Sequence, residues 1–135
     1  MKNHYYNIIK GSDLVYKSYN ANPQGLHTGD CVIRAISTAL DQSWQETLAG
    51  ITVFSLMLSD MPESNRVWGN YLKSKGYKRH AIDTDDYTVE QFASDHPEGI
   101  YILALSGHVV AVIDGDYIDT WDSGKELPIY YWRKE

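Results

Sequence analysis

Residues 101–121 read YILALSGHVVAVIDGDYIDTW, a series of short apolar runs separated by Ser-Gly and Asp-Gly-Asp. Tyr, Ile, Val and Trp favour strands, while Gly and Asp favour tight turns. The pattern therefore predicts strands at 101–105, 108–113 and 117–121, with another at 127–132 after an Asp-Ser-Gly turn. Because strands joined by short turns usually pair with one another, we expect an antiparallel meander.

The region before these strands has the apolar spacing of helices, with hydrophobic residues recurring at intervals of three and four. Helices are expected at 30–41, 43–59 and 63–75. Ser43 followed by Glu46 fits a capping box at the start of the second helix, and Gly76 is suited to end the third.

A short strand at 77–82 and a brief helix at 88–93 are expected between the two halves, with Thr88 and Gln91 marking the start of that helix. Helices in the first half and strands in the second indicate an α+β fold, with one helical layer against one sheet. We expect a single domain over residues 1–135.

Composition limits the classes of function. The chain of 135 residues is 43% hydrophobic and 22% charged, which is typical of one globular domain. Its 12 Lys and Arg against 18 Asp and Glu give a net charge of -6, which opposes binding to phosphate backbones. Apolar runs such as 100–105 are far shorter than the roughly 20 residues of a membrane-spanning helix. We expect a cytoplasmic protein with no nucleic-acid or membrane partner.

Cys31 is the single cysteine, so no internal disulfide or multi-cysteine metal site can form. The residue follows Gly29 and Asp30 and lies in the first turn of the first predicted helix. Free N–H groups and the positive end of the helix dipole lower a thiol pKa there and can hold an oxyanion. Cys31 is therefore a candidate nucleophile, although a small buried hydrophobe is the ordinary alternative. We expect no metal and no cofactor.

His108 is the candidate base among the five histidines. It follows Ser-Gly and begins an apolar strand, whereas the other histidines lie in polar or turn-rich segments. An acidic partner would hold the imidazole in the required tautomer. A three-residue turn centred on Gly115 would place Asp122 beside His108 on the same face, and a two-residue turn would shift the register by one. We favour Asp122, and Asp119 remains the alternative.

The order of Cys at a helix start, His at the start of a strand and Asp at the end of the next strand resembles that of papain-like cysteine peptidases. The strings TGDCVIRAIS (28–37) and GHVVAVIDGDYIDTWDSG (107–124) are similar to those of small uncharacterised papain-like proteins from bacterial prophages. The resemblance extends from about residue 22 onward. It implies that Cys31 is the nucleophile, His108 the general base and acid, and Asp122 the orienting residue.

The chain departs from the papain-like pattern at two residues, and it is short for a peptidase, with no obvious second lobe to form a long cleft. The family usually carries an oxyanion-stabilising Gln about six residues before the Cys, and here Gln24 lies seven before it. The resemblance implies Gln24 as the oxyanion donor, with Thr28 or backbone groups as alternatives. The family's orienting residue is often followed by a shielding Trp, whereas Trp121 precedes Asp122 and follows Asp119. Asp119 therefore remains an alternative for the orienting residue.

The resemblance implies a cysteine hydrolase that cleaves a peptide, isopeptide or related amide bond through a thioester intermediate. Its substrate would be a peptide or a protein. Two alternatives stay open: a protein-binding module on the same fold, which the 11 Tyr and four Trp favour, and a transglutaminase-like acyltransferase with the same triad. The sequence does not indicate an oligomeric state.

Overall fold

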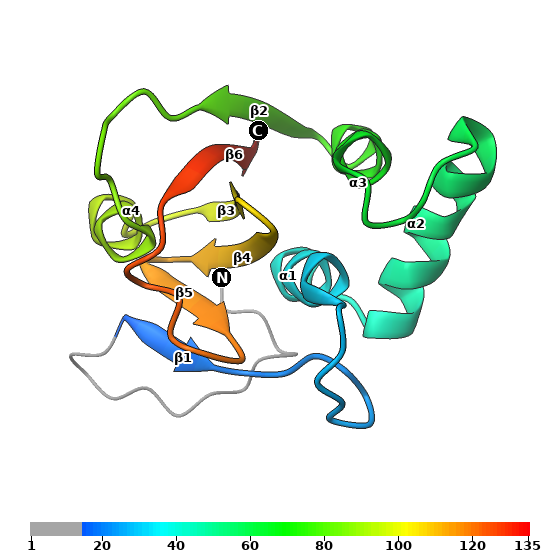
Figure 1. The fold of residues 1–135 in the computed structure, drawn as a ribbon, viewed down its shortest axis with the longest axis horizontal. Coiled ribbons are helices and arrows are strands. Elements are labelled where there is room, and N and C mark those ends of the chain that lie inside the picture. Colours follow the sequence, from blue (N-terminus) through cyan, green and yellow to red (C-terminus); the bar gives the residue numbers. More distant parts are fainter. Residues whose placement is uncertain (1–14) are drawn as a thin grey trace.

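The computed structural model describes residues 15–135 (Figure 1). Its helices are α1 (Cys31–Leu40), α2 (Trp44–Leu58), α3 (Asn65–Ser74) and α4 (Val89–Asp95). Its strands are β1 (Tyr16–Ser18), β2 (Tyr77–Ala81), β3 (Ile100–Leu105), β4 (His108–Ile113), β5 (Asp116–Asp119) and β6 (Pro128–Lys134). The predicted α+β class is confirmed.

The six strands form one mixed sheet in the order β1-β5-β4-β3-β6-β2. The predicted meander holds from β3 through β5 but is wrong for β6, which pairs with β3 and β2 instead of β5. The connection over residues 120–127 is long enough to carry the chain past β4 and β3. This crossing puts Tyr130 and Trp132 into the core beneath the helices. The short strand β1, which was not predicted, adds a parallel pair at the β5 edge.

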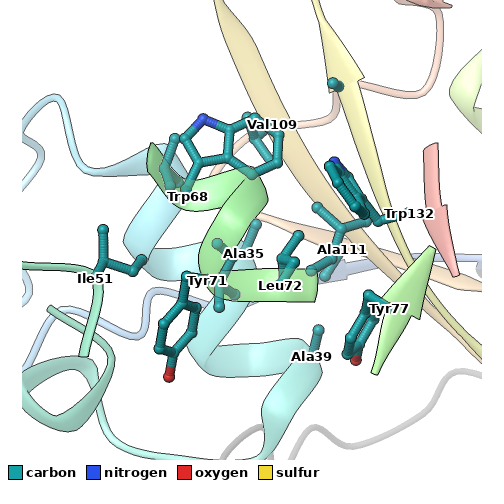
Figure 2. Close-up of a cluster of buried hydrophobic side chains, with 14 of the residues drawn as sticks. Ala35, Ala39, Ile51, Trp68, Tyr71, Leu72, Tyr77, Val109, Ala111 and Trp132 are labelled. Carbon is teal, nitrogen blue, oxygen red and sulfur yellow. The ribbon is translucent and has the colours of Figure 1, made fainter. Parts of the chain in front are cut away.

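Helices cover both faces of the sheet, so the predicted single helical layer is corrected (Figure 1). On one face, α1, α2 and α3 bury a large cluster that includes Ile36, Trp68 and Leu72. Figure 2 shows side chains from α1, α3, β4 and β6 meeting in this cluster. On the other face, α4 packs Val89 and Phe92 against the sheet. The strands are therefore buried on both sides over much of their length.

The local signals at the helix ends are largely as predicted. Thr88 and Gln91 form the reciprocal capping box that starts α4. The Ser43 hydroxyl accepts a hydrogen bond from the Glu46 N–H at the start of α2. Gly76 follows α3 with φ of +86°, a left-handed conformation that glycine adopts at little cost.

Among residues 15–135, none of the helices combines the length and the apolar content needed to cross a membrane.

Candidate active site

The β4–β5 hairpin fixes which acidic residue reaches His108. Asp114 and Gly115 form its turn, both with positive φ (48° and 85°), and Ile113 pairs with Asp116. Positive φ at both central residues is the signature of a type I′ turn, for which Asp-Gly is a preferred sequence. The predicted three-residue turn is therefore wrong.

The shorter turn shifts the register by one residue and brings Asp119 to His108. The Asp119 Oδ2 lies 2.6 Å from the His108 Nε2. The same oxygen accepts a hydrogen bond from the Ser123 hydroxyl (2.7 Å), and Oδ1 accepts one from the Thr120 N–H (2.8 Å). The Asp119 carboxylate is buried and held by these donors, so its position relative to the imidazole is fixed.

The predicted contact between Asp122 and His108 does not form. The Asp122 carboxylate accepts hydrogen bonds from the Tyr117 hydroxyl and the Gly124 N–H instead, and its side chain is exposed. The hydrogen bond from Tyr117 holds the pKa of Asp122 below its usual value. Asp122 thus stabilises the loop after β5, and Asp119 occupies the position that orients the ring.

Cys31 is the first residue of α1, directly after Asp30 at the N-cap. It is half-buried and lies against the first residues of β4. Burial alone would raise the pKa of the thiol. The hydrogen bond and positive charge of His108, together with the Val109 N–H and the Arg34 charge, outweigh burial and lower that pKa. The arrangement therefore favours the thiolate, which is the nucleophilic form.

His108 joins the other two residues. Its side chain is only 13% exposed, and that burial alone would lower the pKa of the imidazole. Hydrogen bonds and charge interactions with Asp119 and Cys31 reverse this effect and raise the pKa from 6.5 to about 9. Because Nε2 faces Asp119, Nδ1 is the ring nitrogen left for the thiol. The three residues are arranged to form a thiolate–imidazolium pair held by a carboxylate.

Trp121 packs beside the His108 ring, with the ring centroids 5.0 Å apart. The indole is 45% exposed, so it covers one side of the imidazole while remaining at the surface.

A buried ion network lies behind this site. Arg34, one turn after Cys31, pairs with the Asp30 carboxylate and has an Nη2 atom 3.8 Å from Asp119 Oδ1. The Asp30 carboxylate also accepts hydrogen bonds from the Trp44 indole (2.9 Å) and the Asn22 amide (3.2 Å). Asp30 therefore makes no side-chain cap on α1 and instead fixes the arginine. Sequence reasoning missed this role, although the i, i+4 spacing of Asp30 and Arg34 is a recognised ion-pair signal.

The loop before Cys31 is organised by Asn22. Its Oδ1 accepts hydrogen bonds from the N–H groups of Gln24 and Leu26. Gln24 and Thr28 are exposed. The role of Gln24 as an oxyanion donor stays a prediction. The N–H groups of the first turn of α1, which no helical carbonyl can satisfy, lie beside the Cys31 sulfur.

A pocket of about 300 Å³ adjoins the start of α1. Its polar lining comes from Thr28, Gly29, Asp30 and Glu63, and the rest of its lining is apolar. Its apolar lining comes from α1, α2 and the segment after α2: Val32, Ile33, Trp44, Leu48 and Pro62. The pocket lies beside the first turn of α1, the helix that begins at Cys31.

The remaining histidines lie outside this constellation. His80 bonds the Glu135 carboxylate (2.7 Å), His96 bonds the Phe92 carbonyl (2.7 Å), and His27 is exposed. His4 lies outside the described residues. Between residues 15 and 135, no group of three or more His, Cys, Asp or Glu side chains is placed to hold a metal ion.

Comparison with protein-family models, curated proteins and solved structures gives no match to this chain.

Proposed function

We propose that this chain is a cysteine hydrolase of papain-like type, which cleaves a peptide, isopeptide or related amide bond. Cys31 is the nucleophile, His108 the general base and acid, and Asp119 the residue that orients the imidazole. The observation that carries the proposal is the continuous contact from the Cys31 thiol through His108 to the Asp119 carboxylate. Nucleophile, base and orienting acid in this order are the elements of a catalytic triad.

In the proposed reaction, the Cys31 thiolate attacks the carbonyl carbon and the carbonyl electrons move onto oxygen. The N–H groups at the start of α1 stabilise that oxyanion. When the tetrahedral intermediate collapses, the C–N bond breaks and the His108 imidazolium gives its proton to the leaving amine. Neutral His108 then takes a proton from water, which attacks the thioester and releases the acid and the thiolate. Asp119 stays ionised and holds the ring in one tautomer throughout.

The proposal accounts for features that a structural cysteine does not need. A buried structural thiol packs against apolar neighbours and has a raised pKa. Cys31 instead contacts an imidazole whose other nitrogen faces a buried carboxylate, and the pocket that adjoins its helix suits an apolar group. We therefore expect a substrate with an apolar side chain near the scissile carbonyl.

An acyl-enzyme measurement tests the proposal. Wild-type protein is incubated with the p-nitrophenyl ester of an acetylated apolar amino acid, and the intact mass is recorded after rapid acidification. We expect one acyl adduct on Cys31 that decays in water, no adduct with Cys31→Ala, and slow formation with His108→Gln. No adduct on the wild-type chain, or equal adducts on all three proteins, would contradict the proposal.

The same experiment separates the alternatives. An added primary amine that captures most of the acyl group as an amide would indicate a transglutaminase-like acyltransferase, because such an enzyme passes the thioester to an amine in preference to water. A thiol that neither acylates nor alkylates faster than a free cysteine would favour a binding module.

A further inference from the structure

A second pocket, of about 300 Å³, lies between α3, β2 and β6. We call it the basic pocket. Three of its side chains carry positive charge: Arg66, Lys73 and Arg79. The rest of its lining is uncharged, and consists of Asn65, Gly69, Asn70, Tyr130 and Trp132. No carboxylate lines the pocket, so its polar surface is dominated by hydrogen-bond donors.

The charge of this region is opposite to that of the whole chain. The net charge is -6, yet α3, β2, β6 and the residue after α3 hold more than half of the 12 lysines and arginines, and contain no acidic residue. These cations are Arg66, Lys73, Lys75, Lys78, Arg79, Arg133 and Lys134. Arg66 has an acidic neighbour, Asp60, at 3.7 Å. Within residues 15–135, neither Lys73 nor Arg79 makes an ion pair, so two charges in the pocket are uncompensated.

Aromatic residues form the floor of the basic pocket. The Arg79 guanidinium lies 4.1 Å from the centre of the Tyr130 ring, and this cation–π contact holds it in place. Trp132 is buried, and its indole N–H has no hydrogen-bond partner among the described residues. Arg79 also has a hydrogen bond with the Tyr130 side chain, and its other N–H groups can bind a carboxylate or phosphate.

Protection of the edge strand β2 from pairing with another chain explains only some of these lysines and arginines. β2 is an edge strand, and charged residues such as Lys78 on an edge discourage pairing with another chain. Lys73 and Arg66 come from a helix, however, and converge with Arg79 on one pocket. Convergence of cations from different elements is what an anionic ligand requires.

Three neighbouring strands of the sheet, β6, β3 and β4, connect the basic pocket with His108. Tyr130 pairs with Ala104, and Ala104 pairs with Val109, the residue after His108. Two strand spacings separate Tyr130 from Val109, which is about 10 Å across the sheet. Tyr130, Ala104 and Val109 also belong to the same side of the sheet.

We propose that the basic pocket binds the carboxylate side chains of a short acidic peptide segment. As a part of the proposed function, on which this step rests, it would select substrates that carry Asp or Glu near the scissile bond. A short segment suits the pocket better than a nucleic acid does, because the negative charge of the rest of the chain repels a long polyanion.

Isothermal titration calorimetry on the full chain carrying Cys31→Ala tests the pocket without turnover. The probes are acetyl-Glu-Glu-Glu-amide, its neutral match acetyl-Gln-Gln-Gln-amide, and inorganic phosphate. We expect the Glu peptide to bind and the Gln peptide not to bind, with an affinity that falls as salt is added. Lys73→Gln and Arg79→Gln should each raise the Kd about tenfold. Lys125→Gln removes the same charge from an exposed site elsewhere and should leave the Kd unchanged.

Equal binding of the Glu and Gln peptides, or a Kd unaffected by Lys73→Gln, would overturn the proposal. Binding of phosphate without binding of the Glu peptide would also overturn it, in favour of a free-phosphate site. Because Lys73 is exposed, its replacement keeps the test valid even if Arg79→Gln disturbs the packing of Tyr130. If the Glu peptide does not bind selectively but wild-type Cys31 is acylated normally, the proposal for the basic pocket is refuted and the proposed hydrolase activity is not. Binding of the Glu peptide without acylation would refute the hydrolase alone.

Discussion

Replacing Asp119 with Asn should lower the pKa of His108 by more than one unit. The wild-type pKa of His108 is raised from 6.5 to about 9. Among the interactions that raise this pKa, the hydrogen bond to Asp119 has the largest effect. At ~1.4 kcal/mol per pKa unit, the whole rise is worth roughly 3 kcal/mol, shared between Asp119 and Cys31. Asn is nearly isosteric and can still accept a hydrogen bond from Nε2–H, but it carries no charge. We therefore expect the mutant imidazole to titrate at about 7 to 8.

Proton NMR measures this pKa directly. The ring resonances are followed over pH, and His108 is assigned by the signal that disappears in His108→Gln. Asp122→Asn is the matched control, because it makes the same chemical change in the same segment while Asp122 bonds Tyr117. We expect the control to titrate near 9, as the wild type does. A pKa unchanged in Asp119→Asn, or lowered only in Asp122→Asn, would refute the assignment of the orienting residue.

The same substitution should change stability with a defined pH dependence. A histidine with a raised folded-state pKa contributes its full stabilisation below the unfolded pKa of 6.5 and loses it as pH rises through about 9. The difference in unfolding free energy between wild type and Asp119→Asn should therefore be largest below about pH 6.5 and shrink toward about pH 9. The remainder at high pH reflects the lost hydrogen bond from the Thr120 N–H, because the single amide oxygen of Asn replaces only the Oδ2 atom that faces His108 and Ser123. Urea unfolding at several pH values measures this difference, and a difference that grows with pH would contradict the argument.

Other substitutions test separate parts of the site. Cys31→Ala should abolish acylation and leave the thermal midpoint nearly unchanged, because a half-buried thiol contributes little packing; a large drop in the midpoint would indicate a structural cysteine. Arg34→Gln should shift the acidic limb of Cys31 alkylation by iodoacetamide to higher pH, since the arginine charge lowers the pKa of the thiol, and Arg34→Lys should restore part of the shift. Gly115→Ala should destabilise the fold by about 1–3 kcal/mol in urea unfolding, because φ is +85° and the new Cβ would lie 3.3 Å from the Pro97 Cα; no loss would show that the turn tolerates a side chain.

Local signals predicted the helices well because caps and apolar spacing act over a few residues. Thr88 with Gln91, Ser43 with Glu46 and Gly76 all end or start helices as their types suggest. The strands that pair with β6 could not be predicted from such local signals. Its pairing with β3 depends on how Tyr130 and Trp132 pack beneath α3, which is a contact between segments far apart in the sequence.

The length of the turn between β4 and β5 decides which acidic residue reaches His108. Asp114-Gly115 is the preferred sequence of a two-residue type I′ turn, and the longer turn assumed from sequence moved the pairing by one residue. This difference of one residue in the register decides whether Asp122 or Asp119 lies beside His108. Burial of Asp119 and its bond to Ser123 are tertiary features that the sequence alone does not contain.

We expect the Cys31 thiol to ionise below the ordinary thiol range and to pair, as a thiolate, with the His108 imidazolium. Because the chain has a single cysteine, the ultraviolet absorbance of wild type minus that of Cys31→Ala reports the thiolate alone. We predict that this absorbance appears below the ordinary thiol range, with a further change near pH 9 as His108 loses its proton. A single step at the ordinary thiol pKa of about 8.5 would contradict it.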